Sequence, residues 1–104
     1  MIVFRCLRVL MFIALIFSIA QFAYSQEREL EELKSLDQQL DKVNRPGNYQ
    51  EAVKVAQKAL VIREKILGSG HPDVATSLNN LAGIYRSLGD YARAVHLCKR
   101  ALAI

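Results

Sequence analysis

Apolar residues between positions 74 and 88 recur every three or four places, the spacing that puts side chains on one face of an α-helix. The members of this stripe are Val74, Ala75, Leu78, Leu81, Ala82, Tyr85 and Leu88. Pro72 and Asp73 suit the first turn of a helix, where a missing amide and a negative charge are both tolerated. Gly89 and Asp90 then break the pattern, so the sequence predicts one helix between Pro72 and Gly89.

Two further apolar stripes of the same kind flank this predicted helix. One covers residues 49–67 and ends before the Gly-Ser-Gly turn at residues 68–70, and the other starts at residue 91. Their members are Tyr49, Ala52, Val53, Ala56, Ala59 and Leu60 in the first, and Tyr91, Ala94, Val95, Cys98, Ala101 and Leu102 in the second. Because alanines let helix backbones approach closely, we expect antiparallel helix pairs, with Cys98 buried like its counterpart Ala56.

The sequence repeats itself at an offset of 42 residues. Residues 47–62 and 89–104 are identical at seven of sixteen aligned positions, among them Gly47 with Gly89 and Tyr49 with Tyr91. A fixed period of about 20 to 50 residues indicates a stacked array in which each unit buries its apolar face against the next. The sequence therefore predicts an all-α fold of antiparallel helix-hairpin repeats, an α-solenoid.

A less regular apolar stripe lies just before this repeat, in a helix predicted at residues 27–44. Its members are Leu30, Leu33, Leu36, Leu40 and Val43. Leu40 stands where the second unit has the smaller Ala82. We therefore interpret residues 26–46 as a degenerate, solvent-facing capping helix of the first repeat, residues 47–70 as its second helix, and residues 71–104 as the second repeat.

The first 25 residues have a different pattern. Arg5 and Arg8 precede an almost wholly apolar run over residues 9–20, and Ala23 and Ser25 follow with the spacing of a cleavage site. This arrangement is typical of a secretory signal peptide, and it predicts export to the periplasm or the exterior with cleavage after Ser25. The alternative is a membrane anchor through an uncleaved segment at residues 9–24, although a spanning helix takes about 20 apolar residues.

Removal of residues 1–25 changes the charge and the cysteine content. The 104-residue chain has 14 basic and 10 acidic residues, and loss of Arg5 and Arg8 lowers the net charge from +4 to +2. So small an excess does not call for a nucleic-acid partner. Cys6 is lost as well, which leaves Cys98 alone and excludes an intrachain disulfide in the processed chain.

The stretch HPDVATSLNNLAGIYRSLGDYARAVHLCKRALAI resembles the tetratricopeptide repeat, because small, aromatic and leucine positions recur in register in both units. The 42-residue period and the HPDVA start resemble the kinesin light chain type within that family, although there is no tryptophan. The resemblance covers residues 33–104. It implies a non-catalytic scaffold that binds a protein or an extended peptide. An alternative that it also implies is the sensing N-terminal segment of a longer enzyme, such as a caspase-like peptidase whose catalytic part is absent.

The resemblance further implies a peptide-binding site on the concave face made by the first helix of each unit. The residues on that face are Asn80, Asn79, Thr76 and Arg86, together with Gly83 and Ser87. An asparagine amide can donate to one backbone group of a peptide and accept from another at once. Arg86 is suited to pair with a ligand carboxylate.

Neither enzymatic activity nor a metal or cofactor is expected. His71 and Asp73 lie at a helix start, and no third ligand has matching spacing. His96 and Cys98 are two positions apart, which points them about 200° apart on a helix. The charged runs at residues 27–32 and 63–65 are interpreted as solvated helix surface.

The second unit stops at Ile104, whereas its counterpart continues to residue 67. Val95, Leu102 and Ile104 correspond to apolar residues of the first unit that the following unit should cover. Stable repeat arrays need about three units. We therefore expect the chain to be a fragment, or to need further repeats, and to self-associate through this apolar strip.

Overall fold

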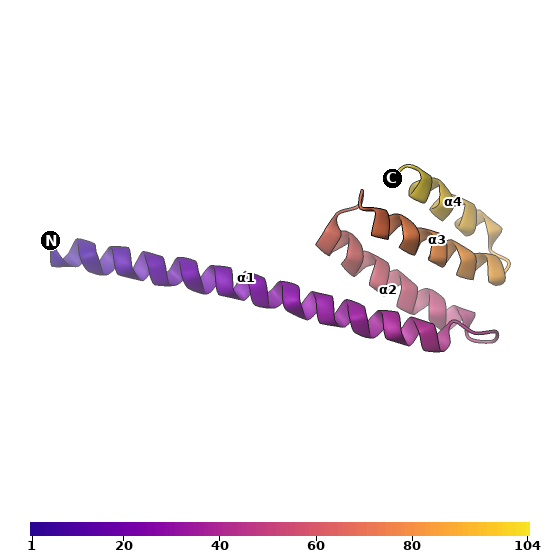
Figure 1. Ribbon diagram of the computed structural model, residues 1–104, viewed down its shortest axis with the longest axis horizontal. Coiled ribbons are helices and arrows are strands. Elements are labelled where there is room, and N and C mark those ends of the chain that lie inside the picture. Colours follow the sequence, from indigo (N-terminus) through magenta and orange to yellow (C-terminus); the bar gives the residue numbers. More distant parts are fainter.

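The computed structural model describes residues 1–104 and consists of four α-helices without strands. The helices are α1 (Ile2–Val43), α2 (Tyr49–Leu67), α3 (Pro72–Ser87) and α4 (Tyr91–Leu102). Short turns at residues 44–48, 68–71 and 88–90 reverse the chain, so successive helices lie antiparallel and side by side (Figure 1). The predicted all-α, helix-hairpin fold is confirmed.

The hydrophobic core lies where α2, α3 and α4 meet. Val74 and Leu78 of α3 are fully enclosed, and Ala52 of α2 has no exposed surface. Twelve buried residues form this cluster: Ala52, Ala56, Leu60, Val74, Leu78, Leu81, Ala82, Ile84, Tyr85, Ala94, Leu97 and Ala101. The stripes that the sequence predicts on these three helices therefore supply most of the core.

A smaller apolar cluster joins α1 to α2. It consists of Leu33 and Leu36 on α1, packed with Val55 and Ala59 on α2. Leu40 and Val43 are partly buried beside it, whereas Leu30 stays exposed. The stripe at residues 30–43 thus packs mainly against α2.

Polar contacts fasten the helices further. Gln57 on α2 donates a hydrogen bond to the Tyr85 hydroxyl on α3 over 2.7 Å. The Arg93 guanidinium on α4 lies 5.6 Å from the centre of the same Tyr85 ring, within the range of a cation–π contact. Glu64 on α2 accepts from Arg100 on α4 at 2.7 Å. These contacts connect α2, α3 and α4 across the core.

α1 is one uninterrupted helix that projects far beyond the other three (Figure 1). The sequence predicts a boundary between residues 1–25 and a helix that begins near residue 27, but the structure has no break between them. No glycine or proline occurs between residues 2 and 43, so nothing interrupts the intrahelical hydrogen bonds. Every residue before Glu29 is exposed, so the packed part of the molecule begins there.

The outer face of α4 is exposed. Val95 retains 52% and Leu102 retains 86% of its surface, and Tyr91 and Ile104 are exposed as well. The prediction that Cys98 is buried is wrong, because its side chain lies on this face. Its counterpart Ala56 is buried because α3 lies against α2, whereas no helix covers the corresponding face of α4.

Candidate functional site

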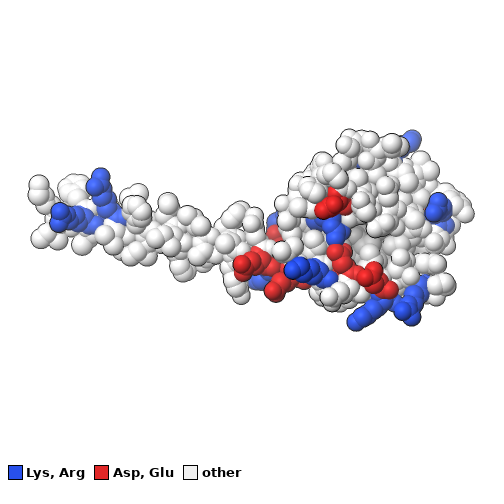
Figure 2. All heavy atoms as spheres, viewed as in Figure 1, with Lys and Arg blue, Asp and Glu red and all other residues white.

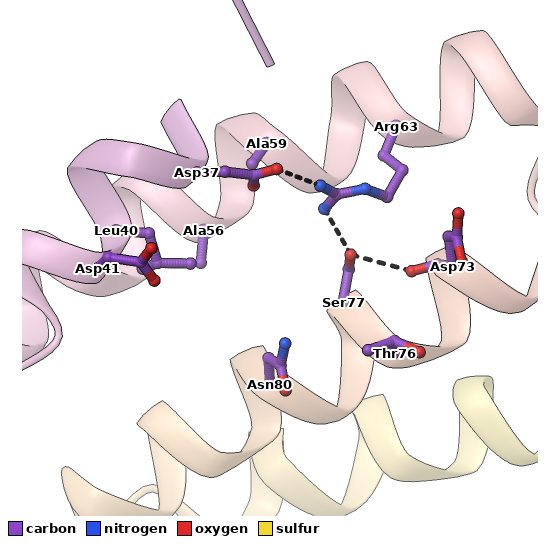
Figure 3. A pocket seen from close by; sticks show the side chains of 10 residues that line it. All are labelled: Asp37, Leu40, Asp41, Ala56, Ala59, Arg63, Asp73, Thr76, Ser77 and Asn80. Carbon is purple, nitrogen blue, oxygen red and sulfur yellow. Dashed lines mark hydrogen bonds and ion pairs between the residues drawn. The ribbon is translucent and has the colours of Figure 1, made fainter. Parts of the chain in front are cut away.

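A groove runs between the C-terminal part of α1 and α3, with α2 forming its floor. It consists of two hollows of about 340 and 600 Å³ that share the residues Leu40, Asp41 and Asn80. Asp41 comes from α1 and Asn80 from α3, so the two residues stand on opposite walls (Figure 3). We call the two hollows together the α1–α3 groove.

Arg63 organises the first hollow. Its side chain rises from α2 and is only 17% exposed. One guanidinium nitrogen donates to the Asp37 carboxylate on α1 and another donates to the Ser77 hydroxyl on α3, each over 2.6 Å (Figure 3). The Ser77 hydroxyl in turn donates to the Asp73 carbonyl at 3.0 Å. One arginine thus connects both walls to the floor and sets the spacing between them.

The remainder of the first hollow is part apolar and part polar. Leu40, Ala56 and Ala59 provide the apolar surface. Asp41, Asp73, Thr76 and Asn80 surround it with polar groups (Figure 3). Thr76 donates its hydroxyl to the Pro72 carbonyl at 3.3 Å, whereas the Asp41 and Asn80 side chains form none of the molecule's side-chain hydrogen bonds or ion pairs.

The second hollow continues the groove toward the C-terminal end of α3. Asn44 and Tyr49 line it beside α1, and Asn79, Gly83 and Arg86 line it on α3. The Ser87 hydroxyl donates a hydrogen bond to the Gly83 carbonyl over 3.1 Å. The Asn79 and Arg86 side chains are exposed and make no side-chain hydrogen bond or ion pair with the rest of the molecule.

The structure brings the predicted peptide-binding residues together along this groove. Asn80 lines both hollows, Thr76 lines the first, and Asn79 and Arg86 line the second. All four lie on α3, the first helix of the second unit. All four side chains are exposed along the same groove, whereas their contact with a ligand stays a prediction.

The residues that α1 and α2 contribute to the groove were not predicted from the sequence, and neither was Ser77 on α3. Asp37 and Asp41 were not singled out, and the interpretation of Arg63 as solvated helix surface is wrong. A signal for Arg63 was present, since it follows Ala56 and Ala59 by seven and four residues and so shares their buried face. The partners Asp37 and Ser77 carry no such local signal, because they meet Arg63 only through helix packing.

The two histidines lie at different helices, and both are outside the two hollows of the groove. His71 precedes α3, where its Nδ1 accepts a hydrogen bond from the Asp73 amide over 3.1 Å and so caps the helix. His96 and Cys98 are both exposed on α4. No group of three or more His, Cys, Asp or Glu side chains is placed to hold a metal ion.

Comparisons with known proteins agree with the helical architecture. The family model described as tetratricopeptide repeat matches residues 44–104. Nephrocystin-3 of Xenopus laevis is 42% identical over 55 residues, which cover 53% of this chain and 4% of that protein. Protein fem-1 homolog C of Danio rerio is 31% identical over 80 residues, which cover 77% of this chain and 12% of that protein. The chain thus spans only a small part of the relatives that it matches.

Proposed function

Because this chain belongs to the tetratricopeptide repeat family, whose repeats build protein–protein interaction scaffolds, we propose that it holds an extended peptide segment of another protein in the α1–α3 groove. One observation carries the proposal. The amides of Asn79 and Asn80 are exposed along a concave surface and have no hydrogen-bond partner within the protein. Two unengaged amides on one groove wall suit the backbone of an extended chain.

The groove chemistry supports backbone recognition with limited side-chain selection. An asparagine side chain offers two donors and an acceptor, so one residue can hold both the N–H and the C=O of a bound peptide. Arg86 adds a cation that is available for a ligand carboxylate. The Arg63 contacts hold the walls in place before a ligand arrives, which lowers the entropic cost of binding.

The test of this function is the substitution Asn80→Ala in the full-length chain in detergent micelles. A displayed library of random dodecapeptides is selected on the unaltered protein, and the enriched peptides are synthesised for titration. We expect Asn80→Ala to weaken their binding about tenfold, which corresponds to about 1.4 kcal/mol. Helix content measured by circular dichroism should not change, because Asn80 lies outside the buried stripe.

The matched control is Gln39→Ala, which removes an exposed amide of α1 that does not line the groove. It should leave the affinity unaltered. Equal loss of binding in both variants, or undiminished binding after Asn80→Ala, contradicts the proposed site.

We also propose that the N-terminal part of α1 directs export of the protein to the periplasm or the exterior. α1 contains a segment apolar and long enough to cross a membrane, and none of it is buried in the fold. A signal sequence near the N-terminus has this property as well. Figure 2 shows basic side chains close to the free end of α1 and an uncharged stretch after them.

Cleavage after Ser25 would spare the packed part, because burial starts at Glu29. The ion pair between Glu29 on α1 and Lys65 on α2 also lies beyond this point. Intact mass spectrometry of the protein isolated from its native cells tests the proposal. A mass that lacks residues 1–25 supports cleavage, whereas the full mass in a membrane fraction would establish the alternative anchor at residues 9–24.

The apolar outer face of α4 supports a third proposal, that the molecule associates with a second copy through this face. Val95 and Leu102 are exposed there next to Cys98. The corresponding residues of α2, Val53 and Leu60, pack in or against the core next to α3. A second molecule on the outer face of α4 would cover Val95 and Leu102 in the same way.

A further inference from the structure

We infer that the peptide segment taken by the α1–α3 groove carries a lysine or arginine, whose cationic head is recognised by Asp41. This inference rests on the proposed function, because it specifies the class of peptide that the same groove selects. The evidence for a basic residue is the charge of the side chains that line the first hollow and the apolar surface that lies between these side chains.

Most of the positive charge in the first hollow is already neutralised. Arg63 is its one basic residue, and its guanidinium is engaged by the Asp37 carboxylate and the Ser77 hydroxyl at 2.6 Å each. Since charge-assisted hydrogen bonds are roughly twice as strong as neutral ones, this arginine is poorly placed to receive a ligand carboxylate. A peptide that enters the hollow therefore meets little free positive charge.

Two carboxylates in the same hollow have no lysine or arginine partner. Asp41 forms no ion pair, and the nearest partner of Asp73 is His71, whose Nδ1 lies 3.8 Å from the carboxylate. That nitrogen also accepts a hydrogen bond from the Asp73 amide at the start of α3. With three carboxylates against one guanidinium the hollow is negative, and Asp41 lies where the first hollow meets the second because it lines both.

The apolar residues explain why the cation should belong to a long side chain. Leu40, Ala56 and Ala59 line the hollow between the polar groups (Figure 3). Lysine and arginine bury their methylene stems against apolar surface while keeping the charged head beside polar groups. A volume of about 340 Å³ lies in the range of sites that enclose small ligands. Asn80, on the wall opposite Asp41, remains free to bind the peptide backbone.

The experiment uses the full-length protein in detergent micelles and the same random dodecapeptide library. Selection is carried out on the unaltered chain, on Asp41→Asn and on Glu51→Gln. Glu51 is the matched control, because it is an exposed carboxylate of α2 that lies outside both hollows. The strongest binders of the unaltered chain are then synthesised with their basic residue kept, or replaced by glutamine or by glutamate.

We expect lysine or arginine to be enriched at one position of the selected peptides. Asp41→Asn should weaken their binding about tenfold and remove the preference for the basic residue, whereas Glu51→Gln should do neither. Replacement of the basic residue by glutamine should cause the same loss in the unaltered protein and no further loss in Asp41→Asn. Raising the salt concentration should reduce the difference between the two proteins, because Asp41 is solvent-exposed.

The outcomes separate this inference from the proposed function. If neutral or acidic peptides are enriched and Asn80→Ala abolishes their binding, the groove binds peptides but the inferred basic residue is wrong. If no peptide is enriched, or if Asn80→Ala has no effect on the enriched ones, both the groove and its selectivity are refuted.

Discussion

At the scale of single residues, small side chains determine how closely the helices pack. Ala52 on α2 and Ala82 on α3 are almost completely buried in the main cluster. Ala94 at 8% exposure performs the same role on α4. Protein interiors are packed as densely as organic crystals, so there is no space at such positions for added methyl groups without movement of a helix.

We therefore expect Ala94→Leu to lower the free energy of unfolding by about 1–3 kcal/mol through overpacking. Ala92→Leu is the control, since Ala92 lies two residues earlier on the exposed side of the same helix. Urea denaturation followed by circular dichroism measures both variants. If the two substitutions destabilise the protein equally, the assignment of the buried face of α4 is incorrect.

At the scale of the helices, glycines determine where the second repeat turns. Gly89 follows α3 with φ of +82°, in the left-handed region that residues with a Cβ atom adopt at a cost. The Asp90 side chain then accepts from the Arg93 amide at 3.2 Å and caps α4. Gly83, by contrast, lies inside α3, with open space where a Cβ would be placed.

These two glycines should respond to alanine in opposite directions. Gly89→Ala should destabilise the protein by about 1–2 kcal/mol, because the left-handed conformation becomes strained. Gly83→Ala should stabilise it by about 0.5–1 kcal/mol, because alanine has the higher helix propensity. Thermal melts of the two variants check the signs, and stabilisation by Gly89→Ala would contradict the turn conformation.

Much of this helical organisation could be predicted from the sequence. α2 lies between Gly47 and Gly68, α3 begins at Pro72, and Gly89 separates α3 from α4, so local signals were sufficient for these boundaries. The uninterrupted course of α1 was not predicted, because the change in composition near residue 26 suggests a boundary although no helix breaker is present.

For the groove, the sequence indicated only the wall on α3. A single amphipathic helix reveals its own polar face, and this is how Asn80 was found. The positions of Asp37 and Arg63 relative to Ser77 depend on how three helices pack together, which periodicity within one helix does not specify.

At the scale of the whole molecule, two apolar surfaces remain uncovered. The first is the projecting part of α1, which gives the structure its length of 72 Å against a width of 29 Å. The second is the outer face of α4, with Val95 and Leu102. Removal of apolar surface from water is favourable by about 25 cal/mol per Å², so both surfaces favour contact with something other than water.

We expect residues 26–104 to be partly unfolded or to self-associate through α4, and extension by one further repeat to remove this behaviour. Val95→Glu should lower the self-association, because a carboxylate on this face would have to be desolvated in the contact. His96→Glu, an exposed neighbour, is the control. Sedimentation over a range of concentrations measures both, and a monomer with a sharp, concentration-independent thermal transition would contradict the expectation.

The order of helix contacts has a consequence for how fast the protein folds. α1 packs on α2, α2 on α3, and α3 on α4, so backbone packing joins only elements that follow each other in the chain. Proteins dominated by such local contacts have low contact order and fold within microseconds to milliseconds. The backbone of each helix packs only against helices that precede or follow it directly, so the search for the native packing is confined to neighbouring segments of the chain.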